Sequence, residues 1–119
     1  MRPREMVRAW VEAFNRRDTA AIAAMYSEGA TNYQVPEQPV TGREAIRAMF
    51  DDAFGLAEMV CIPENIFEDG DWAILEWRDP LGMRGCGFFN IIDDQIVFQR
   101  GYWDKLTFLR LHNLPLPPT

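Results

Sequence analysis

The sequence predicts an α+β fold in which three N-terminal helices pack on one face of an antiparallel β-sheet. Apolar residues repeat at helical spacing through the first 55 residues, whereas β-branched and aromatic residues fill short segments from Met59 onward. The connections between those later segments are too short for crossovers, so neighbouring strands are expected to run antiparallel. Helices first and a sheet second are typical of the α+β class.

The composition is that of one domain with a substantial core. The chain has 119 residues, of which 48% are hydrophobic, and two domains would each be too small to bury enough apolar surface. We therefore expect a single domain over residues 1–119. Twelve Lys and Arg against 18 Asp and Glu give a net charge of −6, which argues against nucleic acid or an anionic membrane as a partner.

Few residue types are available for metal or nucleophilic chemistry. Cys61 and Cys86 are the only cysteines and His112 is the only histidine, so we expect no metal site and no cofactor, with both cysteines packed as small apolar residues. The chain starts in an amphipathic segment and has no apolar run long enough to cross a membrane, which indicates a cytoplasmic protein. Any catalysis would then depend on carboxylates, amides, tyrosines and arginines.

The first two helices follow from the spacing of apolar residues. A helix is expected over residues 4–16, and Asp18 is a plausible N-cap for a second, shorter helix that ends at Gly29. The buried face of the first helix comprises Met6, Val7, Trp10, Val11 and Phe14. The buried face of the second comprises Ile22, Met25 and Tyr26.

A short strand and a third helix complete the N-terminal half. Residues 30–35 are expected to form the strand, and residues 36–39 a loop. Thr41-Gly42-Arg43-Glu44 has the form of a capping box, in which the threonine hydroxyl and Glu44 would satisfy helix amides reciprocally. The third helix would bury Ile46, Met49 and Phe50.

Four strands are expected over residues 59–68, 72–79, 83–92 and 95–104, followed by a helical turn over 105–111. Alternation in the second of these strands places Ala73, Leu75, Trp77 and Asp79 on one face. In the last strand, it places Val97, Gln99, Gly101 and Trp103 opposite Ile96, Phe98, Arg100 and Tyr102. One face should pack on the helices. The outer face mixes aromatic and charged residues, so we expect a homodimer through it.

The order of elements resembles the NTF2-like, or SnoaL-like, cone fold, with three helices packed into a strongly curved sheet. The resemblance spans nearly the whole chain and rests on Trp10-Val11-Glu12-Ala13-Phe14-Asn15 with Asp18, Thr41-Gly42-Arg43-Glu44-Ala45-Ile46, and Gln99-Arg100-Gly101-Tyr102-Trp103-Asp104. It implies a small-molecule pocket inside the cone. The pocket mouth would collect Trp10, Tyr26, Asn32, Gln34, Trp77, Asp79, Phe89, Gly101 and Trp103.

Residues 99–116 look most like the limonene-epoxide-hydrolase branch, which activates a water with an Asp-Arg-Asp group. Carried over by position, its first carboxylate falls on Asp79, its arginine on Trp77 and its second carboxylate on Gly101. Its water-holding pair falls near Asn32 and Gln34. The resemblance therefore implies a pocket of this type in which most of the catalytic group is replaced.

Two other branches match less well. The tyrosine, base and acid of the ketosteroid isomerases fall on Trp10, near Gln34 and near Gly87. The Asp/His arrangement of the SnoaL-type cyclases has no counterpart, because His112 lies too close to the C-terminus. The resemblance implies a fold and a pocket and leaves the reaction open.

Each candidate residue has a second interpretation. Asp79 is a candidate general acid or base if it is buried beside Trp77, and a turn aspartate before Pro80 if it is not. The aromatic side chains can line a ligand or fill the core. Gly87 and Gly101 can leave room beside Trp77 and Trp103, or mark bends of the sheet.

The remaining polar residues also allow two interpretations. Asn32 and Gln34 can bond a ligand carbonyl or satisfy the backbone at a strand end. A mixed-sign set can form a ligand clamp, or ion pairs across the sheet and the dimer interface; it comprises Glu76, Arg78, Arg84, Arg100 and Asp104. Two functions follow: an isomerase, lyase or hydrolase that uses Asp79 for proton transfer, or a non-catalytic, small-molecule-binding homodimer.

Overall fold

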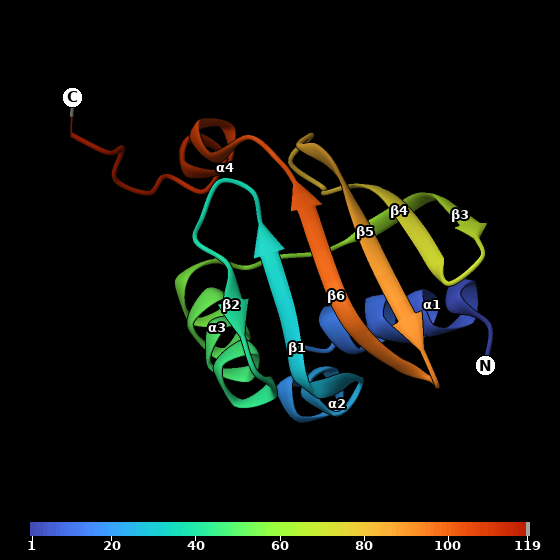
Figure 1. Ribbon diagram of the computed structural model, residues 1–119. Helices are drawn as coiled ribbons and strands as arrows, with labels where there is room; N and C mark the ends of the chain where they lie inside the picture. The colour runs from blue at the N-terminus through green and yellow to red at the C-terminus, as the bar shows by residue number, and fades with distance from the viewer. Residues whose placement is uncertain (119) are drawn as a thin grey trace.

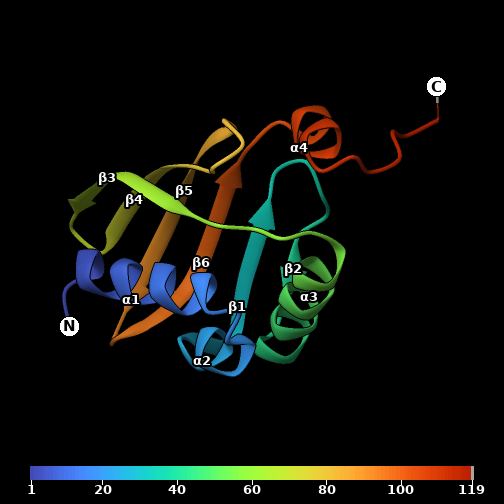
Figure 2. The ribbon, with the colours of Figure 1, turned by 180° about the vertical axis from the view of Figure 1, so that it is seen from behind.

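Three helices cover one face of a six-stranded sheet in the computed structural model, which describes residues 1–118. Helix α1 (Pro3–Asn15) crosses in front of the sheet in Figure 2; α2 (Thr19–Ala24) and α3 (Arg43–Leu56) lie at its lower edge and side, and α4 (Lys105–Leu111) lies at its upper end. The predicted α+β class with three N-terminal helices is confirmed. Thr119, the last residue of the predicted domain, lies outside the described residues. Within residues 1–118, no helix is long and apolar enough to cross a membrane.

The sheet is curved and mixed (Figure 1). Its strands are β1 (Tyr26–Gln34), β2 (Val40–Thr41), β3 (Ile62–Asp69), β4 (Trp72–Arg78), β5 (Arg84–Ile92) and β6 (Gln95–Tyr102), in the order β2-β1-β6-β5-β4-β3. The predicted antiparallel pairing holds from β3 to β6, where connections are short. However, β1 pairs parallel with β6. The chain between them is long enough to allow either direction, so connection length does not decide this pair.

The predicted second helix extends too far. Helix α2 ends at Ala24, and Tyr26 begins β1 rather than continuing the helical face. The reason is a long-range pairing: Tyr26 lies opposite Ile96 of β6, and the Ile96 amide donates to the Met25 carbonyl at 2.8 Å. Asp18 does cap α2, because its carboxylate accepts from the Ala21 amide at 3.0 Å.

The predicted capping box at Thr41 is wrong. The N-cap of α3 is Gly42, and no side chain bonds the first helical amides. Thr41 belongs to β2 instead, where its hydroxyl lies 3.0 Å from the Thr31 hydroxyl of β1. Strand pairing therefore takes the side chain that the cap would need. Gly42 has φ +99°, a backbone conformation that disfavours any residue with a Cβ.

Alternation predicts the faces of β4 correctly and those of β6 only in part. Ala73 and Leu75 are buried on the helix-covered face, which we call the inner face. Ile96 is also buried there, although strict alternation places it on the outer face with Phe98. Ile96 pairs with Ile91 and Phe98 with Asn90, so β6 has one extra residue between them. This bulge reverses the alternation.

Several strand ends differ from the prediction. Strand β3 begins at Ile62 instead of residue 59, and β6 ends at Tyr102 instead of residue 104. Asp104 caps α4 by accepting from the Thr107 amide at 3.1 Å. The final strand therefore gives way to α4, which lies beyond the ends of β1 and β6 (Figure 1).

Candidate ligand-binding cavity

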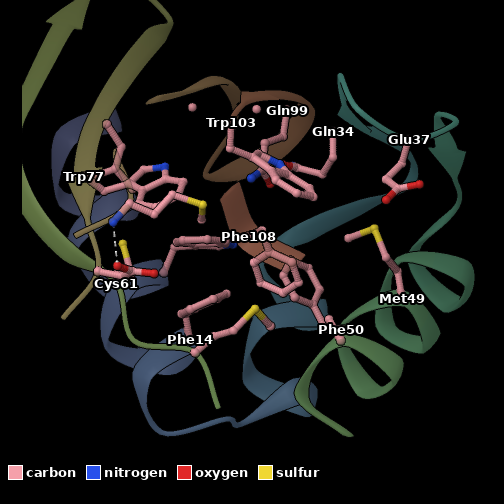
Figure 3. A pocket seen from close by; sticks show the side chains of 18 of the residues that line it. Phe14, Gln34, Glu37, Met49, Phe50, Cys61, Trp77, Gln99, Trp103 and Phe108 are labelled. Atoms are coloured by element: carbon pink, nitrogen blue, oxygen red, sulfur yellow. Dashed lines mark hydrogen bonds between the residues drawn. The ribbon is translucent and has the colours of Figure 1, made fainter. Parts of the chain in front are cut away.

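A cavity of about 460 Å³ lies between the inner face of the sheet and helices α1, α3 and α4. This is the size of many small-molecule sites. Most of the wall is apolar and includes Phe14, Phe50, Leu75, Trp77, Phe89 and Phe108. Figure 3 shows Gln34, Gln99 and Trp103 gathered on one side of the cavity, away from Phe14 and Phe50. We call this side the polar end of the cavity; Glu37, Gln38, Asp79 and His112 also line the largely apolar wall.

Seven of the nine predicted pocket residues line this cavity: Trp10, Gln34, Trp77, Asp79, Phe89, Gly101 and Trp103. Tyr26 and Asn32 do not line it, and both are fully buried behind it. Trp10 and Phe89 serve both predicted purposes, because they face the cavity and also belong to the hydrophobic core. The distinction between core and pocket therefore does not apply to them.

The polar end is a chain of hydrogen bonds that starts at Trp103. The Trp103 indole Nε1 donates to Gln34 Oε1 at 2.9 Å, and Gln34 Nε2 donates to Asn32 Oδ1 at 2.6 Å. Asn32 Nδ2 then donates to Gln99 Oε1 at 3.1 Å. Asn32 therefore does not face a ligand but links two glutamines.

Tyr26, the first residue of β1, joins the same chain and links it to Trp10 of α1. Its hydroxyl donates to Gln99 Oε1 and accepts from Trp10 Nε1 at 3.1 Å and from Asn32 Nδ2 at 3.4 Å. Burial raises the pKa of Tyr26 well above its ordinary value, so the phenol stays neutral. We call the six residues the amide relay: Trp10, Tyr26, Asn32, Gln34, Gln99 and Trp103.

Gln99 is a polar cavity residue that the predicted site omits. It is only 4% exposed, lines the cavity and accepts two hydrogen bonds in the relay. Alternation does place it on one face with Gly101 and Trp103, which is the available signal. Its partner Asn32 lies opposite it in the parallel β1–β6 pair, and that pairing is not visible in the sequence.

Asp79 adopts the predicted turn conformation. Its Oδ1 accepts from the amides of Leu81 and Met83, both at 2.9 Å, and its own amide donates to the Met83 carbonyl. The side chain is nevertheless buried, at 7% exposure, and lines the cavity. One carboxylate oxygen therefore holds the turn, while the other accepts no hydrogen bond within residues 1–118.

Two glycines make room for cavity residues, but not in the predicted way. A Cβ on Gly101 would overlap the amide of Gln34, and a Cβ on Gly85 would overlap the Trp77 ring. Gly101 thus admits Gln34 rather than Trp103. Gly87 leaves a Cβ in ordinary contact with Phe89 at 3.4 Å, so Gly85 is the glycine that accommodates Trp77.

The cavity wall includes one cysteine. Cys61 is buried, and burial raises the pKa of its thiol to about 12, so it packs as a small apolar side chain. Asn15 holds its backbone through two hydrogen bonds of 2.8 and 2.9 Å. Within residues 1–118, no three His, Cys, Asp or Glu side chains gather closely enough to hold a metal ion.

The mixed-sign set does not contribute to the cavity. None of its five residues lines the wall within the described part of the chain. Arg84 instead pairs with Glu64 across β4, and Glu76 accepts from Asn65 at 2.7 Å. Arg100 lies among aromatic rings on the outer face. The set therefore behaves as sheet-surface charge rather than as a clamp for a ligand in the cavity.

Comparisons with known proteins agree with this architecture. The sequence model of the SnoaL-like domain matches residues 7–99, whereas a search of curated proteins found no match. A protein with a ketosteroid isomerase-like fold from Catenulispora acidiphila, solved with trimethylamine, superposes with a TM-score of 0.86 at 18% identity, covering 99% of this chain and 100% of the other.

Two further solved structures extend the likeness. An NTF2-like protein from Cytophaga hutchinsonii gives a TM-score of 0.77 at 15% identity, over 92% of this chain and 96% of its own. TerC, co-crystallised with polyporic acid, gives a TM-score of 0.80 at 15% identity, over 93% of this chain and 98% of its own. At these identities the likeness shows the fold and confirms the expected cone. With the domain match over residues 7–99, the chain belongs to the SnoaL-like domain family.

Proposed function

We propose that this protein binds a small, largely hydrophobic organic molecule inside the cone. The observation that carries the proposal is the largely apolar cavity of about 460 Å³ in which Gln34, Gln99 and Trp103 gather on one side. An apolar body with a few convergent polar groups is the usual makeup of a small-molecule site. Two proteins of the same fold were solved with small organic molecules, trimethylamine and polyporic acid, which supports the proposal.

Binding can be tested with a neutral fluorescent probe, N-phenyl-1-naphthylamine, whose emission rises in apolar surroundings. We expect saturable binding to the natural protein. Ala53 lines the cavity from α3, so Ala53→Trp should fill it and abolish the signal. Ala48 is exposed on the same helix, and Ala48→Trp is the matched control that should bind normally. Equal binding by the two variants would refute an internal site.

Proton transfer by Asp79 is the second candidate function. The observation that favours it is the uncommitted carboxylate oxygen of a buried side chain in the cavity wall. This oxygen would take a proton from a bound substrate and return it elsewhere, as in an isomerase, lyase or hydrolase. The expected orienting role of Asn32 passes to Gln34 and Gln99, because these line the cavity.

Exchange of the α-protons of 2-tetralone in D₂O, followed by NMR, tests this function without a known natural substrate. Asp79→Asn keeps an oxygen for the amides of Leu81 and Met83 and removes only the base. We expect exchange to fall by about 10²- to 10⁴-fold. Unchanged exchange, with the fold intact by circular dichroism, would leave Asp79 a turn residue in a binding protein.

We also propose that a second copy of the chain covers the outer face of the sheet. The Arg100 guanidinium lies 5.2 Å from the ring centre of Phe88, 5.7 Å from that of Phe98 and 5.8 Å from that of Tyr102. Its Nε is buried without a hydrogen-bond partner within residues 1–118. Tyr102 remains 42% exposed. An aromatic face with one unsatisfied donor is suited to a partner surface.

A further inference from the structure

When the hydrogen bonds of the amide relay are assigned, one donor group, Gln99 Nε2, is left without a partner within residues 1–118. The Tyr26 hydroxyl donates once and accepts twice, and both hydrogens of Asn32 Nδ2 are used. Gln99 accepts two bonds at Oε1, while its Nε2 donates to no group within residues 1–118. Gln99 is 96% buried and lines the cavity. The cavity is therefore where its amide hydrogens can be used.

The orientation of Gln99 follows from Trp103 through three steps. An indole N–H can only donate, so Trp103 requires Gln34 to turn its Oε1 toward it. Gln34 Nε2 then meets Asn32, which must present Oδ1. Asn32 consequently turns Nδ2 toward Gln99.

The last step fixes Gln99 itself. Because Asn32 Nδ2 and the Tyr26 hydroxyl both donate toward it, Gln99 must present Oε1 to them. Its Nε2 is left facing the cavity. Turning any single amide of the relay around would place donor against donor, so the orientation is set for the chain as a whole.

We infer that the relay fixes Gln99 as a hydrogen-bond donor at the polar end of the cavity, and that the ligand therefore carries a neutral acceptor oxygen, such as a ketone, on an apolar body. This inference rests on the proposed binding function. No lysine or arginine within residues 1–118 lines the cavity, whereas Asp79 and Glu37 do. An anionic ligand would therefore lose its hydration without gaining the counter-charge of a lysine or arginine.

Two pairs of isosteric probes test whether the polar end of the cavity donates or accepts a hydrogen bond. Acetophenone and α-methylstyrene differ by a carbonyl oxygen in place of a methylene group, and indole and indene differ by a donor N–H. Affinities can be measured by NMR titration of the tryptophan indole signals. For the natural protein we expect acetophenone to bind about three- to tenfold more tightly than α-methylstyrene, and indole no more tightly than indene.

Asn32→Asp should invert this preference. The new carboxylate at position 32 only accepts, so Gln99 would turn Nε2 toward it and present Oε1 to the cavity. Indole should then bind more tightly than indene, and acetophenone should lose its advantage. Trp103→Phe is the second variant, because it removes the donor that orients Gln34 and should bring the acetophenone to α-methylstyrene ratio toward one. If Asn32→Asp does not fold, the result for Trp103→Phe alone tests whether the relay orients Gln99.

The outcomes separate this inference from the proposed function. Failure of all four probes to bind the natural protein would refute the binding site and the inference with it. Binding of the hydrocarbons without a preference for acetophenone would leave the site in place and overturn the inference. A preference for acetophenone that persists unchanged in the folded variants would also overturn it.

Discussion

Gln99 and Arg100 are neighbours in β6 but lie on opposite faces of the sheet, and their surroundings differ. On the inner face, Gln99 belongs to a chain of neutral groups that bond one another within one copy of the protein, and only its Nε2 donor is left for the cavity. On the outer face, Arg100 carries a charge over aromatic rings and has a buried Nε without a partner within residues 1–118. The comparison indicates that one chain forms the cavity, and it supports the proposal that a second copy covers the outer face.

The largest expected effect separates the faces at two adjacent phenylalanines of β5. Phe89 is 1% exposed on the inner face and packs on Trp10 with ring centres 5.2 Å apart. Phe89→Ala should cost about 3–5 kcal/mol of unfolding free energy by leaving a cavity. Phe88→Ala, on the outer face, should cost less, and its cost should grow with protein concentration as the proposed dimer is populated. Urea denaturation at several protein concentrations would check both variants. Equal losses of unfolding free energy that do not depend on protein concentration would contradict the comparison.

The second effect disturbs the inner face through a single methyl group. Gly101→Ala places a Cβ against Gln34 and displaces its amide from Trp103 and Asn32. Leaving these buried groups unpaired should cost about 1–3 kcal/mol of unfolding free energy. Gly87→Ala, on the neighbouring strand, is the control and should cost well under half as much, because its Cβ meets only ordinary contact. Thermal unfolding of both variants would test this, and the reverse order would show that Gln34 relaxes without loss.

The third effect breaks the outer face alone. Arg100→Met should remove the cation–π contacts with Phe88, Phe98 and Tyr102. Those rings belong to the same chain, so the effect on the proposed dimer comes from the Nε donor that a second copy would satisfy: one such hydrogen bond, worth about 1.5 kcal/mol, would weaken the dimer about tenfold. Sedimentation equilibrium measures the dimer constant, and N-phenyl-1-naphthylamine binding should stay unchanged because the cavity lies on the other face. A weakened probe affinity with an unaltered dimer would contradict the assignment of functions to the two faces.

How far the sequence predicts each face depends on whether its contacts are local. The first helix and the meander of β3 to β6 were predictable because periodicity and short connections determine them. The end of α2 was not, since Tyr26 fits a helical face and is drawn into β1 by Ile96. Thr41 likewise satisfies the form of a helix cap, but a strand partner takes its hydroxyl.

The candidate site shows the same limit at the level of side chains. The seven cavity residues among those predicted were recognisable because the family resemblance places them around the pocket mouth, and alternation puts Trp77 with Asp79 and Gly101 with Trp103 on one face of their strands. Gln99 was not, because its role depends on Asn32 lying opposite it in a parallel pair formed between distant segments. The bulge between Ile96 and Phe98 also changes the faces of β6, and no local residue pattern marks it.

The smallest expected effect compares two carboxylates of β3 by pH. Glu68 accepts from Arg2 and from the Arg4 amide near α1, and Glu64 accepts from Arg84 of β5; these bonds hold the pKa of each carboxyl below its ordinary value. A lowered pKa in the folded state stabilises the fold above the unfolded-state pKa, and that stability is lost as the pH falls through the folded-state pKa. Stability should therefore decline below about pH 4. Arg2→Ala and Arg84→Ala should each make this decline shallower, by a small amount that salt reduces further because the pairs are exposed. The difference in Tm between neutral and acidic buffer measures the effect, and a decline as steep in both variants as in the natural protein would mean that neither pair contributes.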